Sequence, residues 1–468
     1  MNKQLFFDDN LLFSIENAMR KYGDAFAIGE YCDSACSTDL CTGHVFKLDD
    51  GTYRMLYFAY GKAFQGRKKL FSAKSTDGIS FAPEDLTGRV CPDGKMFAHE
   101  IMDIPDGGEV VYVYEDNHTD KPDERYKMLM SVLDSKSLYV NDPIYVSGDL
   151  LNWKRKENVR WGNGAEPLGG VFYNSREGVH TILQRPFWGV RRVGYKETRD
   201  WESFTEYRDC LNADAYDQPL AEIYGMFAFE YDGHFIGLPH IYRSVPKNLG
   251  AKYAGGIIDT QLAYSKDGRY WQRGLREPFI SGSDRGIGMT WVTDMKDDDG
   301  GDIRFYGSAS YAEHGMNSVD SDNSGKIFIY GLRKDGFVSV STKDKSIPTT
   351  VATREKLWHG GELHVNIKAK KATVAVYISE PEDKKRLNIF GEGRPIKGFA
   401  HEDCMPFCGD SKDWIPVFKS NKSLDSLKGK TVIFEIKFED GDLYSISGDF
   451  TDLFNTEAAR YRILDILP

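Results

Sequence analysis

The stretch Ser75-Thr76-Asp77-Gly78-Ile79-Ser80-Phe81 decides the fold, because a turn of the form Ser-x-Asp-Gly-x-x-aromatic recurs along the chain. In such a turn the Asp side chain accepts local backbone N–H bonds and Gly adopts a positive φ. The aromatic residue that follows is placed to pack between neighbouring sheets. Further copies are Ser147-Gly148-Asp149-Leu150-Leu151-Asn152-Trp153, Thr198-Arg199-Asp200-Trp201-Glu202-Ser203-Phe204 and Ser265-Lys266-Asp267-Gly268-Arg269-Tyr270-Trp271, with a fainter fifth at Arg333-Lys334-Asp335-Gly336-Phe337. Asp-Gly turns are common in any β protein, and the shared trailing aromatic is what marks a repeat.

The spacing of the copies sets the size of the repeating unit. From Asp77 to Asp335 the successive Asp markers are 72, 51, 67 and 68 residues apart, each enough for one four-stranded antiparallel sheet. Strand-like runs come before the turns, at residues 53–58, 125–130, 234–238 and 302–306. Five such units predict an all-β protein with a five-bladed β-propeller over residues 1–337.

The periodicity changes after residue 337, where we expect a second domain over residues 338–468. It contains strand-like runs without the turn marker, at residues 362–366, 373–378 and 431–438. These runs predict a β-sandwich. Residues 456–467 have a helical pattern.

Composition and charge narrow the function classes. The formal net charge is −11 and there is no Lys/Arg block, so the footprint of a phosphate backbone is missing and a nucleic-acid partner is not expected. Acidic residues interrupt the apolar residues of positions 1–20, and no uncharged run approaches membrane-spanning length. Seven cysteines, an odd number, favour reduced thiols, so we expect a cytoplasmic protein.

With the repeat and the appended sandwich in hand, the chain resembles the invertase/levanase and arabinanase superfamily, which comprises glycoside hydrolase families 32 and 43. The resemblance is strongest in the blade ends, in 125–127, in 259–265 and in 360–366. The invertase-type Asn-Asp-Pro-Asn-Gly opening is absent near residue 1, as are the Arg-Asp-Pro and Glu-Cys pairs. Specific fructosidase activity is therefore not expected.

The resemblance implies catalytic acids at the start of the first strand of different blades. Glycosidic cleavage needs one carboxylic acid to protonate the leaving oxygen and a second carboxylate to attack or to activate water. Asp39, Glu166 and Glu222 open blades one, three and four. We expect Glu222 to act as the general acid and Asp39 as nucleophile or base, while Glu166 orients the substrate.

Other polar and aromatic residues lie where blade loops should reach the funnel. The expected substrate-binding residues are Asp116, Arg185, Trp188, Arg191, Asp217, His240, Asp259, Trp291 and His314. Two of them, Arg185 and Arg191, would also suit a uronic acid or a sugar phosphate. No zinc-site spacing is found and no cofactor is expected, although the fold is compatible with one divalent cation at the propeller axis.

These features predict a glycoside hydrolase that removes a terminal sugar, for example a furanoside, from a short oligosaccharide. Two alternatives stay open: a non-catalytic carbohydrate-binding propeller, and a phosphorylase or lyase on the same fold. The sequence does not decide the oligomeric state and is compatible with a homo-oligomer.

Overall fold

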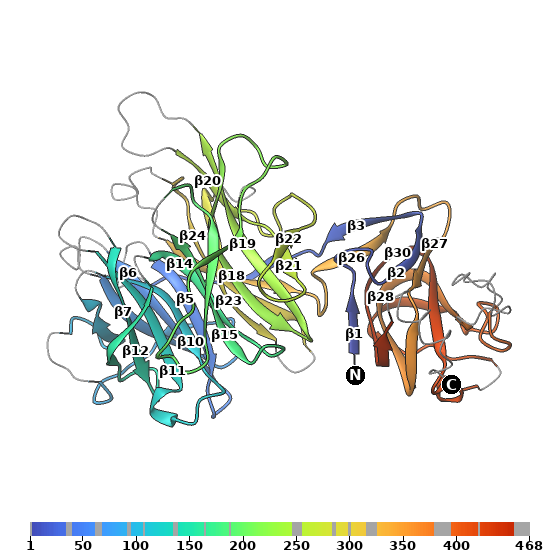
Figure 1. Cartoon of the computed structure of the whole chain (residues 1–468), viewed down its shortest axis with the longest axis horizontal. Coiled ribbons are helices and arrows are strands. Elements are labelled where there is room, and N and C mark those ends of the chain that lie inside the picture. Colours follow the sequence, from blue (N-terminus) through green and yellow to red (C-terminus); the bar gives the residue numbers. More distant parts are fainter. Residues whose placement is uncertain are drawn as a thin grey trace. The chain divides into compact units, whose positions relative to one another are not determined.

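The computed structural model describes residues 2–33, 40–60, 68–90, 95–105, 108–133, 139–162, 165–186, 189–245, 255–282, 287–297, 301–314, 325–378, 395–419 and 422–453. The chain is built from strands and divides into two compact units, residues 24–332 and residues 1–23 with 333–468 (Figure 1). The second boundary lies close to the predicted one at 337. The first 23 residues, by contrast, belong with the C-terminal unit and not with the propeller, because their strands pair there.

Residues 24–332 form four sheets, the largest of which has nine strands and comprises two blades, and we number the five blades in chain order. Blade one is β5 (Leu40–Lys47), β6 (Tyr53–Tyr60), β7 (Lys68–Ser75) and β8 (Ala82–Pro83), with β9 (Glu100–Asp103) also on β7. Blade two is β10 (Glu109–Glu115), β11 (Tyr126–Leu133), β12 (Tyr139–Ser147) and β13 (Lys154–Gly162). Blade three is β14 (Ala165–Asn174), β15 (Val179–Pro186), β16 (Val193–Thr198) and β17 (Arg208–Leu211).

Blades four and five share one continuous set of pairings. Blade four is β18 (Ala221–Tyr231), β19 (His234–Val245), β20 (Gly255–Thr260), β21 (Ala263–Ser265) and β22 (Trp271–Arg273). Blade five is β23 (Met289–Asp297), β24 (Ile303–Ser310), β25 (Lys326–Leu332) and β4 (Phe26–Tyr31). A single bridge, Ile258 with Met289, joins the two blades.

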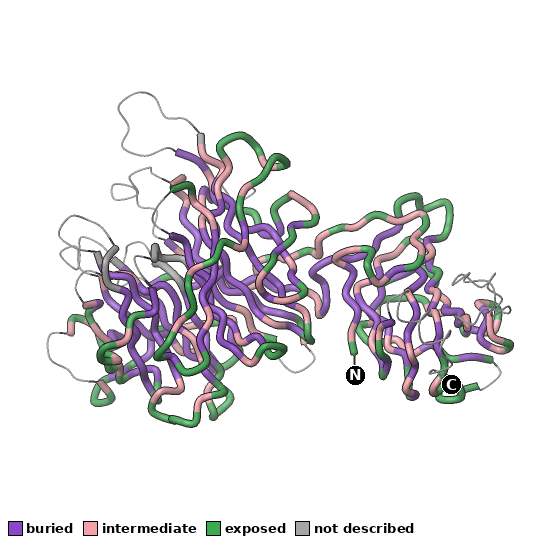
Figure 2. Tube along the Cα trace, in the orientation of Figure 1, coloured by how far each residue is buried: buried purple, intermediate pink, exposed green. Residues whose placement is uncertain are grey.

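The first strands of the blades contact one another in a closed ring, in the order β5, β10, β14, β18, β23 and back to β5. Strand pairing also closes the ring. β4, which precedes blade one in the chain, is the outer strand of blade five and pairs with β25. Buried side chains from adjacent blades form shared apolar clusters. Figure 2 shows that buried residues run along most of the propeller strands. The predicted five-bladed β-propeller is confirmed.

The turn motif has one geometry in the first four copies. In each, the residue after the Asp has a positive φ: Gly78 (69°), Leu150 (68°), Trp201 (58°) and Gly268 (74°). Each Asp accepts two backbone N–H bonds from residues just beyond it, as Asp77 does from Ile79 at 2.8 Å and Ser80 at 2.7 Å. The turn therefore links the third strand of a blade to its outer strand.

The fifth copy does not form this turn. Asp335 itself has the positive φ (59°), and its carboxylate accepts hydrogen bonds from Lys3 and Ser445, which belong to the same C-terminal unit as Asp335. The physical reason is the ring closure: blade five takes its outer strand from β4, so no turn is needed after β25. The motif at 333–337 therefore begins the C-terminal unit.

The turn makes a testable contribution to stability. Asp267 accepts N–H bonds from Arg269 (2.8 Å) and Tyr270 (2.9 Å), so Asp267→Ala leaves two amides without their acceptor. By analogy with helix caps we expect a loss of about 1–2 kcal/mol of unfolding free energy, measured by urea denaturation. The exposed Asp120 serves as the control, since Asp120→Ala should change stability by less than about 0.5 kcal/mol. Equal losses in both variants would contradict the assigned role of the turn.

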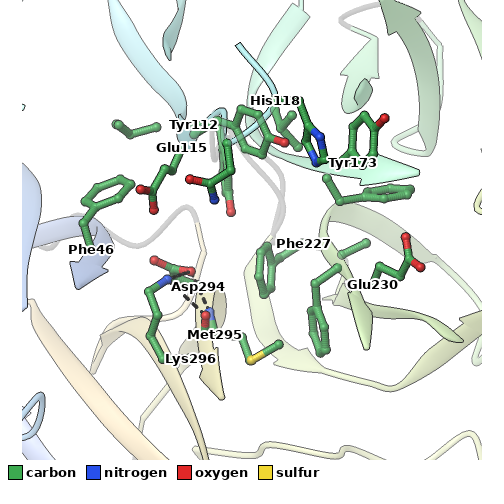
Figure 3. Close-up of a pocket in the computed structure, with 17 residues that line it drawn as sticks. Phe46, Tyr112, Glu115, His118, Tyr173, Phe227, Glu230, Asp294, Met295 and Lys296 are labelled. Atoms are coloured by element: carbon green, nitrogen blue, oxygen red, sulfur yellow. Dashed lines mark hydrogen bonds and ion pairs between the residues drawn. The ribbon is translucent and has the colours of Figure 1, made fainter. Parts of the chain in front are cut away.

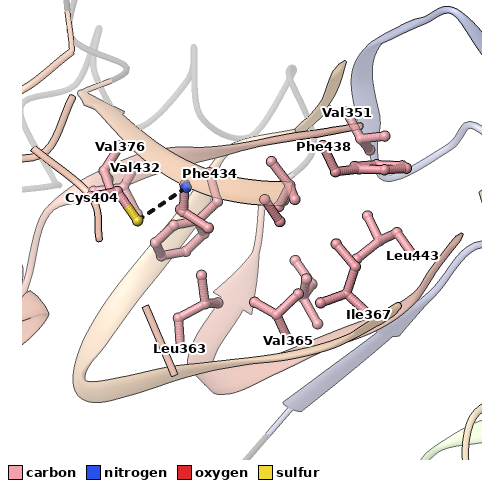
Figure 4. Close-up of a cluster of buried hydrophobic side chains, with 14 of the residues drawn as sticks. Val351, Leu363, Val365, Ile367, Val376, Cys404, Val432, Phe434, Phe438 and Leu443 are labelled. Carbon is pink, nitrogen blue, oxygen red and sulfur yellow. Dashed lines mark hydrogen bonds between the residues drawn. The ribbon is translucent and has the colours of Figure 1, made fainter. Parts of the chain in front are cut away.

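The C-terminal unit is a β-sandwich. Its strands are β1 (Asn2–Leu5), β2 (Leu12–Glu16), β3 (Ala18–Tyr22), β26 (Val338–Thr342), β27 (Thr349–Thr353), β28 (Lys356–Ile378), β29 (Phe407–Trp414) and β30 (Thr431–Asp452). The long strands β28 and β30 contain the three predicted strand runs and enclose one apolar cluster that includes Val365, Phe434 and Leu443 (Figure 4). The predicted helix at 456–467 lies outside the described residues.

Among the described residues, no helix is long and apolar enough to cross a membrane.

Candidate active site

The candidate site lies where the inner strands of the propeller begin. Glu222 is the second residue of β18, and Glu166 is the second residue of β14, the neighbouring inner strand. The Cα partner of Glu166 is Arg185 on β15, whose guanidinium lies 4.3 Å from the ring centroid of Tyr224. Tyr224 is two residues beyond Glu222 on β18, and both side chains contact Arg191. Two of the three predicted acids thus open adjacent blades at one end of the propeller.

Glu222 is held by Arg191 through two hydrogen bonds. The backbone N–H of Arg191 donates to Oε1 at 3.1 Å, and its guanidinium Nη1 donates to Oε2 at 2.5 Å. The Ile223 N–H also donates to the Arg191 carbonyl, so the loop after β15 is fixed against the start of β18. This Glu222 side chain is 23% exposed, which leaves room for a ligand to reach it.

Two tyrosines and a histidine complete the cluster around Glu222. Tyr242 on β19 is the Cα partner of Glu222, and burial raises the pKa of its phenol. The His314 ring packs on both Tyr224 and Tyr242, with centroids 5.1 and 4.6 Å away, and its Nε2 lies 3.1 Å from the Tyr224 hydroxyl. The Arg191 guanidinium is 5.7 and 5.3 Å from the two tyrosine rings. The cluster therefore offers aromatic faces, cationic donors and one carboxylate together.

Sequence reasoning named Arg185, Arg191, Glu222 and His314 but missed the two tyrosines. Tyr224 is only two residues from Glu222 in the same predicted strand, and this proximity was available in the sequence. Predicting that Tyr242 lies opposite Glu222 required the register of the β18–β19 hairpin. That pairing is irregular between Ile223 and Gly225.

Three other predicted ligand-binding residues have protein partners. Asp217 is paired with Arg273 and Arg276. Asp259 is buried against Arg243, with Nε 2.6 Å from Oδ2, and burial raises its pKa despite that partner. His240 is buried, its Nε2 lies 2.9 Å from the Val292 carbonyl, and burial lowers its pKa to about 4. These side chains hold blades four and five in place.

Of the remaining predicted residues, Asp116 lies apart from the cluster. Asp116 follows the last residue of β10, at the opposite end of the inner strands, where it accepts hydrogen bonds from Trp201 Nε1 at 2.9 Å and Lys127 Nζ at 3.1 Å. It therefore joins blades two and three. Trp291 lies in β23 and is half-buried. Asp39 and Trp188, and the side chain of Glu166, lie outside the described residues.

A metal site is not found within the described ranges, where no group of three or more His, Cys, Asp or Glu side chains is arranged to hold an ion.

We find no family model and no curated protein that matches this sequence. Among solved structures the chain is similar to an N-acetylgalactosamine deacetylase from F. plautii in complex with blood group B trisaccharide (12% identity, 69% of this chain and 97% of that one, TM-score 0.45). It is also similar to a thermostable family-43 glycoside hydrolase (12%, 69% and 97%, 0.43) and to a family-32 β-fructofuranosidase from Bombyx mori (12%, 91% and 94%, 0.41). At these identities the similarity is one of fold alone.

Proposed function

We propose that this protein is a carbohydrate-active enzyme, specifically a glycoside hydrolase that removes a terminal sugar from a short oligosaccharide. The observation that carries the proposal is the cluster at the start of β18, where a partly exposed carboxylate lies among Arg191, Tyr224 and Tyr242. Aromatic faces can pack against the C–H face of a sugar ring, and the charged groups can bond its hydroxyls. Glu166 opens the neighbouring inner strand, which supplies the second acid that the reaction needs.

The contacts of Glu222 refine its proposed role. A carboxylate that accepts hydrogen bonds from Arg191 is engaged as an anion, which suits the group that attacks the anomeric carbon or takes a proton from water. We therefore propose Glu222 as nucleophile or base, in place of the acid role expected from the sequence. The proton for the leaving oxygen would then come from Glu166 or Asp39. Hydrolysis adds water across the bond, so no co-reactant is required.

The test is a screen of aryl glycosides and short oligosaccharides, both furanosides and pyranosides, with the product anomer followed by NMR. Release of a monosaccharide that does not depend on phosphate supports the proposal. Turnover only with added phosphate would assign a phosphorylase, and an unsaturated product absorbing in the ultraviolet would assign a lyase. Absence of turnover over the whole screen contradicts an enzymatic role.

A non-catalytic sugar-binding propeller is the second candidate, and the Arg191–Glu222 ion pair favours it, because that pair occupies the carboxylate in the absence of substrate. A binder would bind an oligosaccharide of the screen but release no product from any compound. In either case we propose a cytoplasmic setting, where the ligand would be an imported fragment.

A further inference from the structure

The propeller has a second opening, at the end where its inner strands finish. A cavity of about 310 Å³ lies there, and each of the five blades contributes the last residues of its inner strand (Figure 3). Residues that line it include Phe46, Tyr112, Tyr173, Phe227 and Lys296. The volume falls at the small end of the range for ligand pockets, roughly 300–1,000 Å³.

This cavity is separate from the candidate active site. Glu222 opens β18, whereas Glu230, near the end of the same strand, lines the cavity. Eight residues of extended chain span roughly 25 Å at about 3.3 Å per residue. A ligand of this size in one site therefore does not touch the other.

Aromatic rings make up much of the wall. Tyr112 and Phe227, from blades two and four, lie nearly parallel at 21° with centroids 6.1 Å apart. The exposed His118 ring stacks on Tyr173 with centroids 3.5 Å apart. These flat hydrocarbon faces suit a ligand that has a face of C–H groups.

The lining carries three carboxylates, on Glu115, Glu230 and Asp294, and one ammonium group, on Lys296, and each carboxylate already has a protein partner. Glu115 accepts both of its bonds from Arg125 on Oε1, which leaves Oε2 outside that pair. Asp294 is paired with Lys296 at 2.8 Å, and Lys296 Nζ also donates to the Met295 carbonyl, so two of its three protons are used. A strongly charged ligand of either sign would meet a like charge here, because carboxylates and Lys296 share the wall (Figure 3).

We propose that this second opening binds one ring of a neutral sugar, as a binding site distinct from the one at the start of the strands. Sugar hydroxyls both donate and accept hydrogen bonds. They can therefore accept the remaining proton of Lys296 and donate to Oε2 of Glu115. The ring's C–H face would lie on the aromatic wall. The inference does not depend on the proposed function, since it concerns the opposite end of the propeller.

The test is binding of single sugars to the full chain, measured by saturation-transfer NMR and calorimetry. The panel holds neutral glucose, galactose, xylose, arabinose and N-acetylglucosamine, cationic glucosamine and anionic glucuronic acid. We expect a neutral sugar to bind, and Lys296→Met to weaken it about tenfold or more through loss of a charged hydrogen-bond donor. Glu230→Gln, which keeps the side-chain shape, provides a second pocket variant, for which we expect a smaller loss of affinity.

Two control variants locate the binding. Glu202→Gln and Asp120→Ala, both at exposed positions that line neither site, should leave the affinity unchanged. Circular dichroism shows whether each variant is folded. Neutral-sugar binding that survives both pocket variants, binding of the charged sugars alone, or no binding by any panel member would each overturn the proposal. Turnover is not measured, so failure here and failure of the hydrolase assignment are independent.

Discussion

Replacing Glu222 by Gln is expected to lower kcat for glycoside hydrolysis by about 10²–10⁴-fold, the contribution usual for a positioned acid or base. The amide keeps the size of the side chain and one oxygen for the Arg191 bonds, but it cannot attack a sugar or accept a proton. We expect KM to change much less than kcat. Steady-state kinetics on whichever substrate the glycoside screen identifies provide the measurement.

Glu202→Gln is the matched control, because this carboxylate is 55% exposed and pairs only with Lys156 among its described contacts. It should retain full activity. Glu166→Gln tests the second acid and should also lower kcat, with an aryl glycoside bearing a good leaving group rescuing the rate if Glu166 is the proton donor. Full activity in Glu222→Gln would remove this residue from the mechanism.

Replacing Asp217 by Ala is expected to cost about 3–5 kcal/mol of unfolding free energy, because it removes the buried carboxylate that binds Arg273 through both of its oxygens. The two side chains are 5% and 1% exposed, and Arg273 Nη1 and Nη2 lie 2.8 and 2.5 Å from the two carboxylate oxygens. Urea denaturation followed by tryptophan fluorescence measures the loss. The pair also fixes the loop that leads into Glu222.

The neighbouring Asp214 supplies the control in the same loop. It contacts the same two arginines, 2.8 Å from Arg276 and 3.7 Å from Arg273, but its side chain is 46% exposed. We expect Asp214→Ala to cost no more than about 1 kcal/mol. Similar losses for both variants would show that burial does not set the strength of the Asp217 pair.

Low pH should reduce the loss of stability caused by Asp217→Ala. Burial alone would raise the pKa of this carboxyl, but the bonds from Arg273 lower it below its ordinary value. A lowered folded-state pKa means that the pair stabilises the protein fully above the ordinary Asp pKa and loses its effect as the pH falls through the folded-state pKa. The stability difference between the parent and Asp217→Ala should therefore shrink in acid and be constant near neutrality.

The repeat predicted the blades because its signal is local. Each Asp turn joins strands that are neighbours in sequence, and its bonds span only two or three residues. The closing strand β4 carried no such signal, since it pairs with β25 across almost the whole propeller and an edge strand has no characteristic side chains. The same difficulty hid β1, β2 and β3, whose partners lie beyond residue 337.

The candidate site could be predicted only in part. Acids that open inner strands can be found from strand position, and this identified Glu222. The partners that decide what a carboxylate does come from other strands: Arg191 for Glu222, Arg273 for Asp217 and Arg243 for Asp259. Sequence spacing did not distinguish a carboxylate that faces ligand from one already bonded to a buried arginine.

The order of the strands in the C-terminal unit has a consequence for biosynthesis. β3 emerges from the ribosome before the propeller, yet its partner β26 begins only at Val338, after the whole propeller has been made. The sandwich therefore assembles around an insertion and waits for translation to reach its last long strand, β30. Ribosome-bound chains halted once Leu332 has left the exit tunnel should contain a closed ring whose leading segment is still cleaved readily by protease.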